Sequence, residues 1–134
     1  MSYALSAERA RAAYQANTVR DDDPLGLVVK LYDGMLGFLR RGSELLEESR
    51  YREAAEPIRR ATDIVGELQA VLDLDRGGEV AANLDRLYTY ARRRIVEAHL
   101  GSDPAGLREV ADLLQPLRDA WAEAREKTLA AGVR

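Results

Sequence analysis

Cysteine is absent from this chain of 134 residues, which excludes disulfides, thiol nucleophiles and zinc-thiolate sites. A single histidine is too few for the paired Glu-x-x-His motifs of a di-iron bundle, and no serine has an evident histidine base. No apolar run approaches the roughly 20 residues that span a bilayer, and the N-terminus lacks the layout of a secretory signal. We therefore expect a cytoplasmic protein that is not an enzyme and holds no metal or other cofactor.

An excess of positive charge is also missing. The chain has 20 lysines and arginines against 23 aspartates and glutamates, for a formal net charge of −3, so its overall field does not attract a polyphosphate backbone. The run Arg92-Arg93-Arg94 would spread around most of a helix circumference and form no phosphate-binding stripe. We expect these arginines to be solvated or ion-paired, and no nucleic-acid partner.

Stretches typical of a β-sheet are almost missing, and turn signals divide the chain into helical segments. The predicted fold is all-α: an antiparallel up-down-up-down four-helix bundle with a short, mobile N-terminal helical arm. The arm and its linker would occupy residues 1–23, and the bundle, a single domain, residues 24–130.

Capping residues predict where the helices begin and end. Asp23 is a good N-cap and Pro24 suits the first helical position, so the first long helix should run from there to about Leu46. Three further breaks, at residues 49–51, 75–78 and 101–104, separate the other long helices.

Other residues qualify these boundaries. The arm, from about Tyr3 to Asn17, has few apolar residues to bury and should form a weak helix. Pro57 predicts a late helix start or a kink, and Pro116 predicts a kink. Gly77 is suited to the left-handed position that follows a helix.

The first long helix carries two apolar stripes, although a bundle helix needs only one. Both follow the spacing that places residues on one helix face: Leu25, Val28, Tyr32, Met35, Leu39 and Leu46 in the first stripe, and Leu27, Leu31, Gly34, Phe38 and Leu45 in the second stripe. Two interpretations stay open. The helix is simply the most buried of the bundle, or the arm covers the second stripe until an amphipathic partner helix replaces it.

The single histidine, His99, falls in the last turn of the third long helix, where a cation interacts favourably with exposed carbonyl groups. This position favours a capping role. The alternative function is a signalling or phosphotransfer helical bundle that uses His99.

Several short motifs occur in a fixed order along the chain. They are Ala13-Tyr14-Gln15, Asn17-Thr18-Val19, Pro24, Leu31-Tyr32-Asp33-Gly34, the run from Gly77 to Leu84, Leu87-Tyr88-Thr89-Tyr90, Arg93-Arg94, Ala98, Asp103, Glu109-Val110 and Asp119-Ala120-Trp121. Their order and spacing resemble the flagellar export chaperone family FliS, over essentially residues 13–125.

The resemblance implies a cytoplasmic, non-enzymatic chaperone of flagellar type III export. Such a protein binds the C-terminal helical segment of flagellin, prevents its premature polymerisation and delivers it to the cytoplasmic domain of the export gate. The client is extended and wraps around the bundle as separate helices. A weak homodimer through the same surface stays open.

The resemblance also suggests which residues bind the partner: Tyr14, Leu27, Leu31, Tyr32, Gly34, Phe38, Leu45, Asn83, Leu87 and Tyr88. Tyr14 would lie in the arm or its docking site, and Asn83 and Tyr88 would anchor client backbone groups or helix contacts. The chain departs from the family in Asp21-Asp22-Asp23 and in Arg11, where an apolar arm residue is common. A charge at Arg11 predicts looser docking of the arm.

Overall fold

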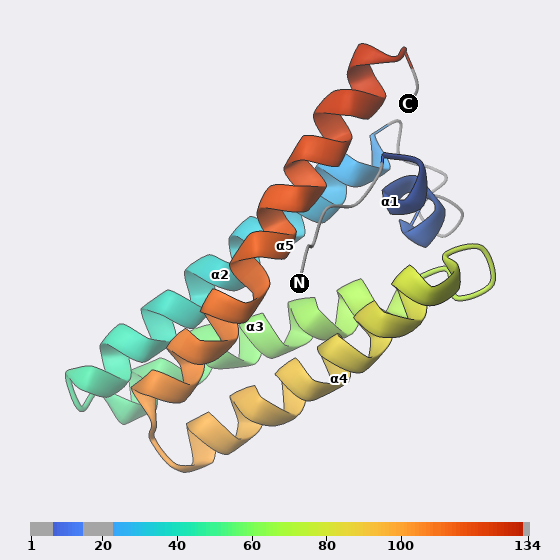
Figure 1. Cartoon of the computed structure of the whole chain (residues 1–134). Helices are drawn as coiled ribbons and strands as arrows, with labels where there is room; N and C mark the ends of the chain where they lie inside the picture. The colour runs from blue at the N-terminus through green and yellow to red at the C-terminus, as the bar shows by residue number, and fades with distance from the viewer. Residues whose placement is uncertain (1–6, 15–22, 133–134) are drawn as a thin grey trace.

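The computed structural model describes residues 7–14 and 23–132. These residues form five α-helices and no strand: α1 (Ala7–Tyr14), α2 (Pro24–Glu47), α3 (Tyr51–Ala70), α4 (Gly78–Leu100) and α5 (Pro104–Ala130). The four long helices run antiparallel in chain order (Figure 1), which confirms the predicted all-α bundle. Of the predicted arm, only α1 lies within the described residues. No helix among them is long and apolar enough to cross a membrane.

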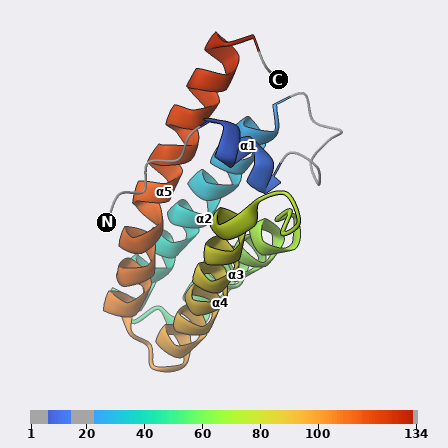
Figure 2. The ribbon, with the colours of Figure 1, turned by 45° about the vertical axis from the view of Figure 1, so that its right-hand side comes forward.

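Helix α2 is the most extensively packed helix. It lies against α3 on one side and α5 on the other, and α4 contacts α3 and α5 less closely. Toward one end of the bundle the pair α2 and α5 separates from the pair α3 and α4, and α1 lies in this opening (Figures 1 and 2). Among the described residues α1 contacts α5, α2 and α4 but not α3. The short helix therefore completes the open end of the bundle.

The predicted caps are partly confirmed. The Asp23 side chain accepts a hydrogen bond of 3.0 Å from the backbone N–H of Gly26, and Pro24 occupies the first turn. The prediction for Gly77 is wrong, because its φ is −78° and the left-handed residue is Gly78, at φ +55°. Gly78 thus adopts the left-handed conformation of this turn, whereas Gly77 allows a close approach of α1 that is described below.

Both internal prolines lie inside continuous helices. Helix α3 already begins at Tyr51, so Pro57 does not delay its start, and α5 runs through Pro116. Pro57 is buried, so its ring adds to the core although it supplies no N–H to the helix.

Ion pairs connect α2 and α5 along their length. Arg118 lies 2.8 Å from Asp33, Arg125 lies 2.7 Å from Asp23, and Arg108 pairs with Glu47. All six side chains are about a third exposed or more, so solvent screens each pair and each contributes little to stability. Their common effect is to favour one antiparallel register of the two helices.

Candidate functional site

Helix α1 docks through one apolar face. Ala10, Ala13 and Tyr14 are spaced three and four residues apart, so they share a helix face, and all three are fully buried. Because the helix has only 8 residues, its own backbone hydrogen bonds cannot hold it together in water. Its order therefore depends on the surface that receives it.

Three tyrosines from three helices meet at this surface. The hydroxyl of Tyr88 in α4 lies 2.7 Å from the hydroxyl of Tyr14 in α1 and 2.6 Å from that of Tyr32 in α2. A hydroxyl has one donor and two acceptor sites, so Tyr88 can donate to one neighbour and accept from the other. The tyrosine triad Tyr14, Tyr88 and Tyr32 is thus a continuous hydrogen-bonded chain that joins α1 to the bundle.

Burial raises the pKa of each hydroxyl in the triad well above its ordinary value of 10.0. The closeness of the hydroxyls adds to this effect, because a phenolate would be repelled by the electron-rich oxygen of its neighbour. At physiological pH the triad is uncharged. It acts as a hydrogen-bonded contact and not as an acid or base.

Trp121 of α5 forms the other wall of the site. Its ring centroid lies 5.2 Å from that of Tyr14 in an edge-on contact and 6.4 Å from that of Tyr32. Its indole Nε1 is buried and has no hydrogen-bond acceptor among the described residues, and the same is true of Nε of Arg11. The indole also lies close enough to the Tyr32 hydroxyl to act on its pKa, which it lowers against the larger effect of burial.

The backbone of α1 also joins the connection between α3 and α4. The N–H of Asp73 donates a hydrogen bond of 2.8 Å to the carbonyl oxygen of Ala13. A Cβ added to Gly77 would lie 3.1 Å from Cα of Ala13 and 2.7 Å from the carbonyl oxygen of Asp73. The absence of a side chain at Gly77 therefore allows α1 to approach this connection closely.

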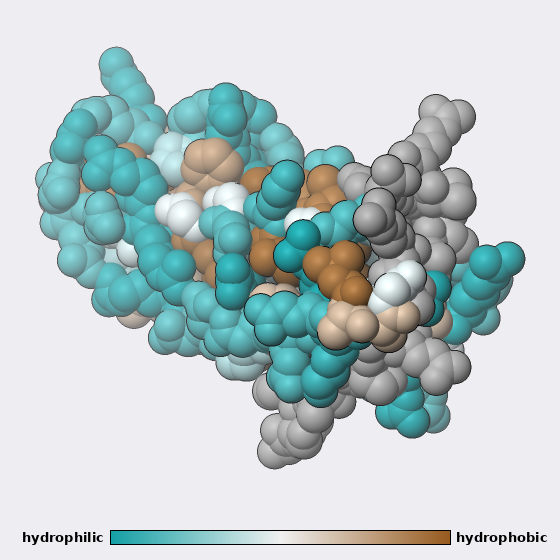
Figure 3. All heavy atoms as spheres, turned by 90° about the horizontal axis from the view of Figure 1, so that it is seen from above, coloured by the Kyte–Doolittle hydropathy of each residue, from teal (hydrophilic) through white to brown (hydrophobic). Residues whose placement is uncertain are grey.

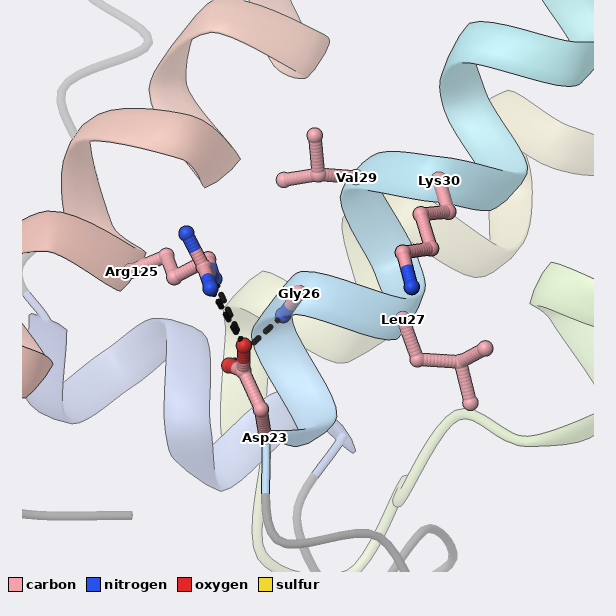
Figure 4. Close-up of a pocket in the computed structure, with 6 residues that line it drawn as sticks. All are labelled: Asp23, Gly26, Leu27, Val29, Lys30 and Arg125. Carbon is pink, nitrogen blue, oxygen red and sulfur yellow. Dashed lines mark hydrogen bonds and ion pairs between the residues drawn. The ribbon is translucent and has the colours of Figure 1, made fainter.

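A second contact fixes the start of α2, where the arm joins the bundle. Figure 4 shows the Asp23 carboxylate between the backbone N–H of Gly26 and the Arg125 guanidinium of α5. Arg125 lowers the pKa of Asp23, chiefly through the hydrogen bond between them. Leu27 points to the other side of α2 from Arg125 in this view. The ion pair connects the start of α2 to α5.

The second stripe of α2 lies on the side of α3, away from α1. A Cβ on Gly34 would meet Cδ1 of Ile64, and the Arg60 guanidinium lies 5.6 Å from the Phe38 ring centroid. Leu27, Leu31, Gly34 and Phe38 are partly buried, and Leu45 is buried. Covering by the arm was one of two interpretations left open, and α1 does not support it, because its Tyr14 is joined through Tyr88 to Tyr32 of the first stripe. The other interpretation, that α2 is simply the most buried helix of the bundle, describes the second stripe better.

A shallow depression remains in this second stripe. Phe38 and Leu45 of α2 and Pro57 of α3 line it, with a rim of charged side chains, and its volume is about 400 Å³. Viewed from above, apolar side chains also form a band across the molecule between hydrophilic ones (Figure 3). Among the exposed large hydrophobic residues are Leu74, between α3 and α4, and Leu129, near the end of α5. Apolar surface thus stays accessible beyond the part that α1 covers.

The structure brings only part of the predicted partner-binding set together. Tyr14, Tyr32 and Tyr88 converge, whereas the second stripe lies elsewhere on α2. On α4, Leu87 is partly buried against the core, and Asn83 is exposed and accepts a hydrogen bond from Arg86. The apolar face of α1 is fully buried although Arg11 carries a charge, and the looser docking expected from Arg11 stays a prediction.

Sequence reasoning missed three residues of this site. It named Trp121 as part of the motif Asp119-Ala120-Trp121 and gave it no role in the site. It gave no role to Asp73, whose contact with α1 is made by the backbone. Gly77 carried a signal, since paired glycines mark a turn, but nothing in the sequence indicates which of the two a neighbouring helix approaches.

Comparison with known proteins identifies the family of this chain. Residues 6–128 match the family described as flagellar protein FliS. The chain belongs to the FliS family of flagellar secretion chaperones. It is 39% identical to flagellar secretion chaperone FliSB of Pseudomonas aeruginosa, over 77% of this chain and 82% of that protein. Flagellar secretion chaperone FliS is 34% identical in Bacillus subtilis, over 84% of this chain and 83% of the relative. The relative in Salmonella typhimurium is also 34% identical, over 83% of each chain.

Membership of the FliS family makes the chain a non-enzymatic chaperone of flagellar secretion. The alternative that relied on His99 loses its basis. His99 lies in the last turn of α4, where the sequence placed it, and is only partly exposed. Its position is that of a residue that complements a helix C-terminus.

Proposed function

We propose that this FliS-family chaperone works in the cytoplasm and binds the C-terminal helical segment of flagellin. By holding that segment it prevents premature polymerisation, and it then delivers the client to the cytoplasmic domain of the export gate. The observation that carries the proposal is the docking of α1. An 8-residue helix occupies an aromatic groove between helices that otherwise separate, so the bundle has a site for an amphipathic helix that its own core does not fill.

A longer client helix can compete with α1 for this groove. It would bury more apolar surface at about 25 cal/mol per Å², and it need not leave the indole N–H of Trp121 without an acceptor. The tyrosine triad supports the exchange, since the bond between Tyr32 and Tyr88 survives the departure of Tyr14. The receiving surface therefore keeps one of its two hydroxyl contacts when α1 leaves.

The second stripe offers a further contact for the same client. Its depression at Phe38, Leu45 and Pro57 has an apolar floor and a charged rim, which suits one apolar side chain from a second helical segment. A client bound at both places would be extended around α2. This arrangement keeps it from forming the helix pairs required for polymerisation.

Titration calorimetry with the C-terminal peptide of flagellin from the same organism tests the proposal. We expect binding of one peptide per chain with a negative heat-capacity change. Deletion of residues 1–17 removes α1 and should tighten binding, because the peptide no longer competes with it. Leu87→Asp and Leu31→Asp should each weaken binding at least about tenfold, since a carboxylate would then be buried in the interface.

Val96→Asp is the matched control. Val96 also lies on α4, but it is 48% exposed and two turns beyond Tyr88, so its replacement should leave peptide binding unchanged. Absence of binding by both the intact and the truncated chain would remove flagellin as the client. Equal losses in Val96→Asp and Leu87→Asp would show that the groove is not the binding site.

A further inference from the structure

Helix α4 presents a second stripe of side chains on its outer side. Its buried seam, which includes Tyr88, faces the bundle. The outer stripe follows heptad spacing along the opposite side of the helix, and its members are all exposed: Arg86, Thr89, Arg93, Val96 and Leu100. In Figure 1, α4 (yellow to gold) runs along one edge of the molecule. No described element of the chain covers this stripe.

The end of the outer stripe is apolar. Leu100 is 83% exposed, the largest exposure among the large hydrophobic residues that the structure describes, and Val96 one turn earlier is 48% exposed. Single exposed hydrophobic residues are ordinary on a protein surface. Two on adjacent turns of one stripe form a small continuous apolar contact.

The remainder of the outer stripe is positively charged. Within residues 7–14 and 23–132, Arg86, Arg92 and Arg93 form no ion pair with a carboxylate. Arg86 bonds to Asn83, Arg92 donates to Gln69, and Arg93 lies 5.5 Å from the ring centroid of Tyr90.

The neighbouring Arg94 behaves differently, because it pairs with Asp103 and Glu109 and so joins α4 to α5. Arg92 lies beside α3 and is not part of the outer stripe. Arg86 and Arg93, the two arginines of the stripe, are thus unneutralised in a chain whose net charge is −3, and each can attract a carboxylate of a partner.

We propose that the outer stripe of α4 docks an acidic amphipathic helix of a second protein. Glutamates or aspartates of that helix would neutralise Arg86 and Arg93, and its apolar residues would cover Val96 and Leu100. The outer stripe lies opposite Tyr88, so this partner and a helix in the α1 groove can be bound simultaneously. The proposal stands independently of the identity of the client.

A lipid surface with anionic headgroups is the other surface that basic and apolar residues can contact. The stripe fits it poorly, because interfacial helices bury a broad apolar face. In α4 that face is committed to the core, and only Val96 and Leu100 project outward.

A titration monitored by backbone NMR tests the proposal with a peptide of ~21 residues, three heptads, that carries leucine and glutamate on one face. We expect chemical-shift changes along Arg86, Arg93 and Leu100, and weaker binding at higher salt. A second peptide with lysine in place of glutamate should bind at least about tenfold more weakly. The changes should appear with and without flagellin peptide bound.

Paired variants locate the binding. Arg93→Glu combined with Leu100→Ser should weaken the acidic peptide at least about tenfold without affecting the fold, since both side chains are exposed. Arg41→Glu is the charge-matched control, because Arg41 is exposed on α2 and lies outside the outer stripe of α4. Equal binding of both peptides, or no difference between the paired variant and the control, would overturn the proposal. So would tighter binding of the chain to anionic phosphatidylserine vesicles than to the acidic peptide.

Discussion

The two ends of the bundle are held together by different kinds of contact. At the end opposite α1, here called the closed end, glycine lets the helices meet directly. A Cβ on Gly42 would lie 2.8 Å from Cγ1 of Ile58 and 3.3 Å from Cδ1 of Leu107. At the arm end, bulky aromatic rings and a chain of hydroxyls fill the space between separated helices.

This difference separates stability from function. The closed end is made of long helices in continuous van der Waals contact, so no part of it can leave without opening the core. The arm end contains one short segment with its own connection, and its hydroxyl contacts contribute little net free energy each. A segment held in this way can be exchanged for a client while the rest of the bundle stays folded.

The largest expected effect is at the closed end. Gly42→Phe should lower the free energy of unfolding by about 3 kcal/mol, because the ring must displace Ile58 and Leu107. Gly37→Phe is the matched control, since a Cβ at Gly37 on the same helix meets nothing within 4 Å. Urea denaturation measures both. A loss below about 1 kcal/mol in Gly42→Phe would show that the closed end is not tightly packed.

A smaller effect is expected from the middle of the tyrosine triad. Tyr88→Phe leaves the hydroxyls of Tyr14 and Tyr32 without the partner they share, which should cost about 2 kcal/mol. Tyr90→Phe is the control, because its hydroxyl bonds only to exposed Glu109, at 3.2 Å. If both variants unfold at the same urea concentration as the unchanged chain, the triad does not stabilise the arm end.

The end of the triad should matter less than its middle. Tyr14→Phe keeps the ring on Trp121 and leaves the bond between Tyr32 and Tyr88 intact, so the docking of α1 should weaken by only about 1 kcal/mol. Hydrogen exchange of the Asp73 amide measures this docking directly, because its acceptor is the Ala13 carbonyl of α1. Faster exchange at Asp73 with unchanged exchange near Gly42 is the expected result.

The same amide should report a dependence on high pH. Burial raises the folded-state pKa of the triad hydroxyls above 10.0, so their contribution is complete below that pH and is lost as pH rises through the folded-state pKa. Docking of α1 should therefore weaken in alkali before the closed end opens. If α1 undocked and the closed end unfolded at the same pH, the two ends would not be independent units.

The sequence predicted the framework well. The N-cap at Asp23, the breaks between long helices and the buried seams depend on local chemistry and on a helical period, and both can be read from neighbouring residues. The second apolar stripe of α2 could also be identified from the helical spacing of its residues. Periodicity shows which residues share a face, however, and does not show which helix covers it.

That limit explains why the position of α1 could not be predicted. Nothing near Tyr14 in the sequence indicates that its hydroxyl meets Tyr88 or that its ring meets Trp121. Trp121 has the spacing of ordinary core, and the contact between Asp73 and Ala13 involves backbone atoms that every residue has. These contacts depend on how far the helix pairs separate, which is decided by packing across the whole bundle.

The smallest expected effect concerns the joint between the arm and the bundle. Asp23→Asn removes the charge opposite Arg125 and should cost less than about 1 kcal/mol, because both side chains are about a third exposed and are screened by solvent. Arg125 lowers the pKa of Asp23 below 3.8, so its contribution is present above that pH and is lost as pH falls through the folded-state pKa.

Asp33→Asn is the matched control for this joint, since Asp33 pairs with Arg118 farther along the same two helices. If the arm end is an independently exchangeable unit, Asp23→Asn and Asp33→Asn should lower the unfolding free energy by similar small amounts, and neither should accelerate exchange at Asp73. Faster exchange at Asp73 in Asp23→Asn alone would show that the ion pair holds α1 as well as α2. The start of α2 would then belong to the exchangeable arm end, and the fixed part of the bundle would begin after the first turn of α2.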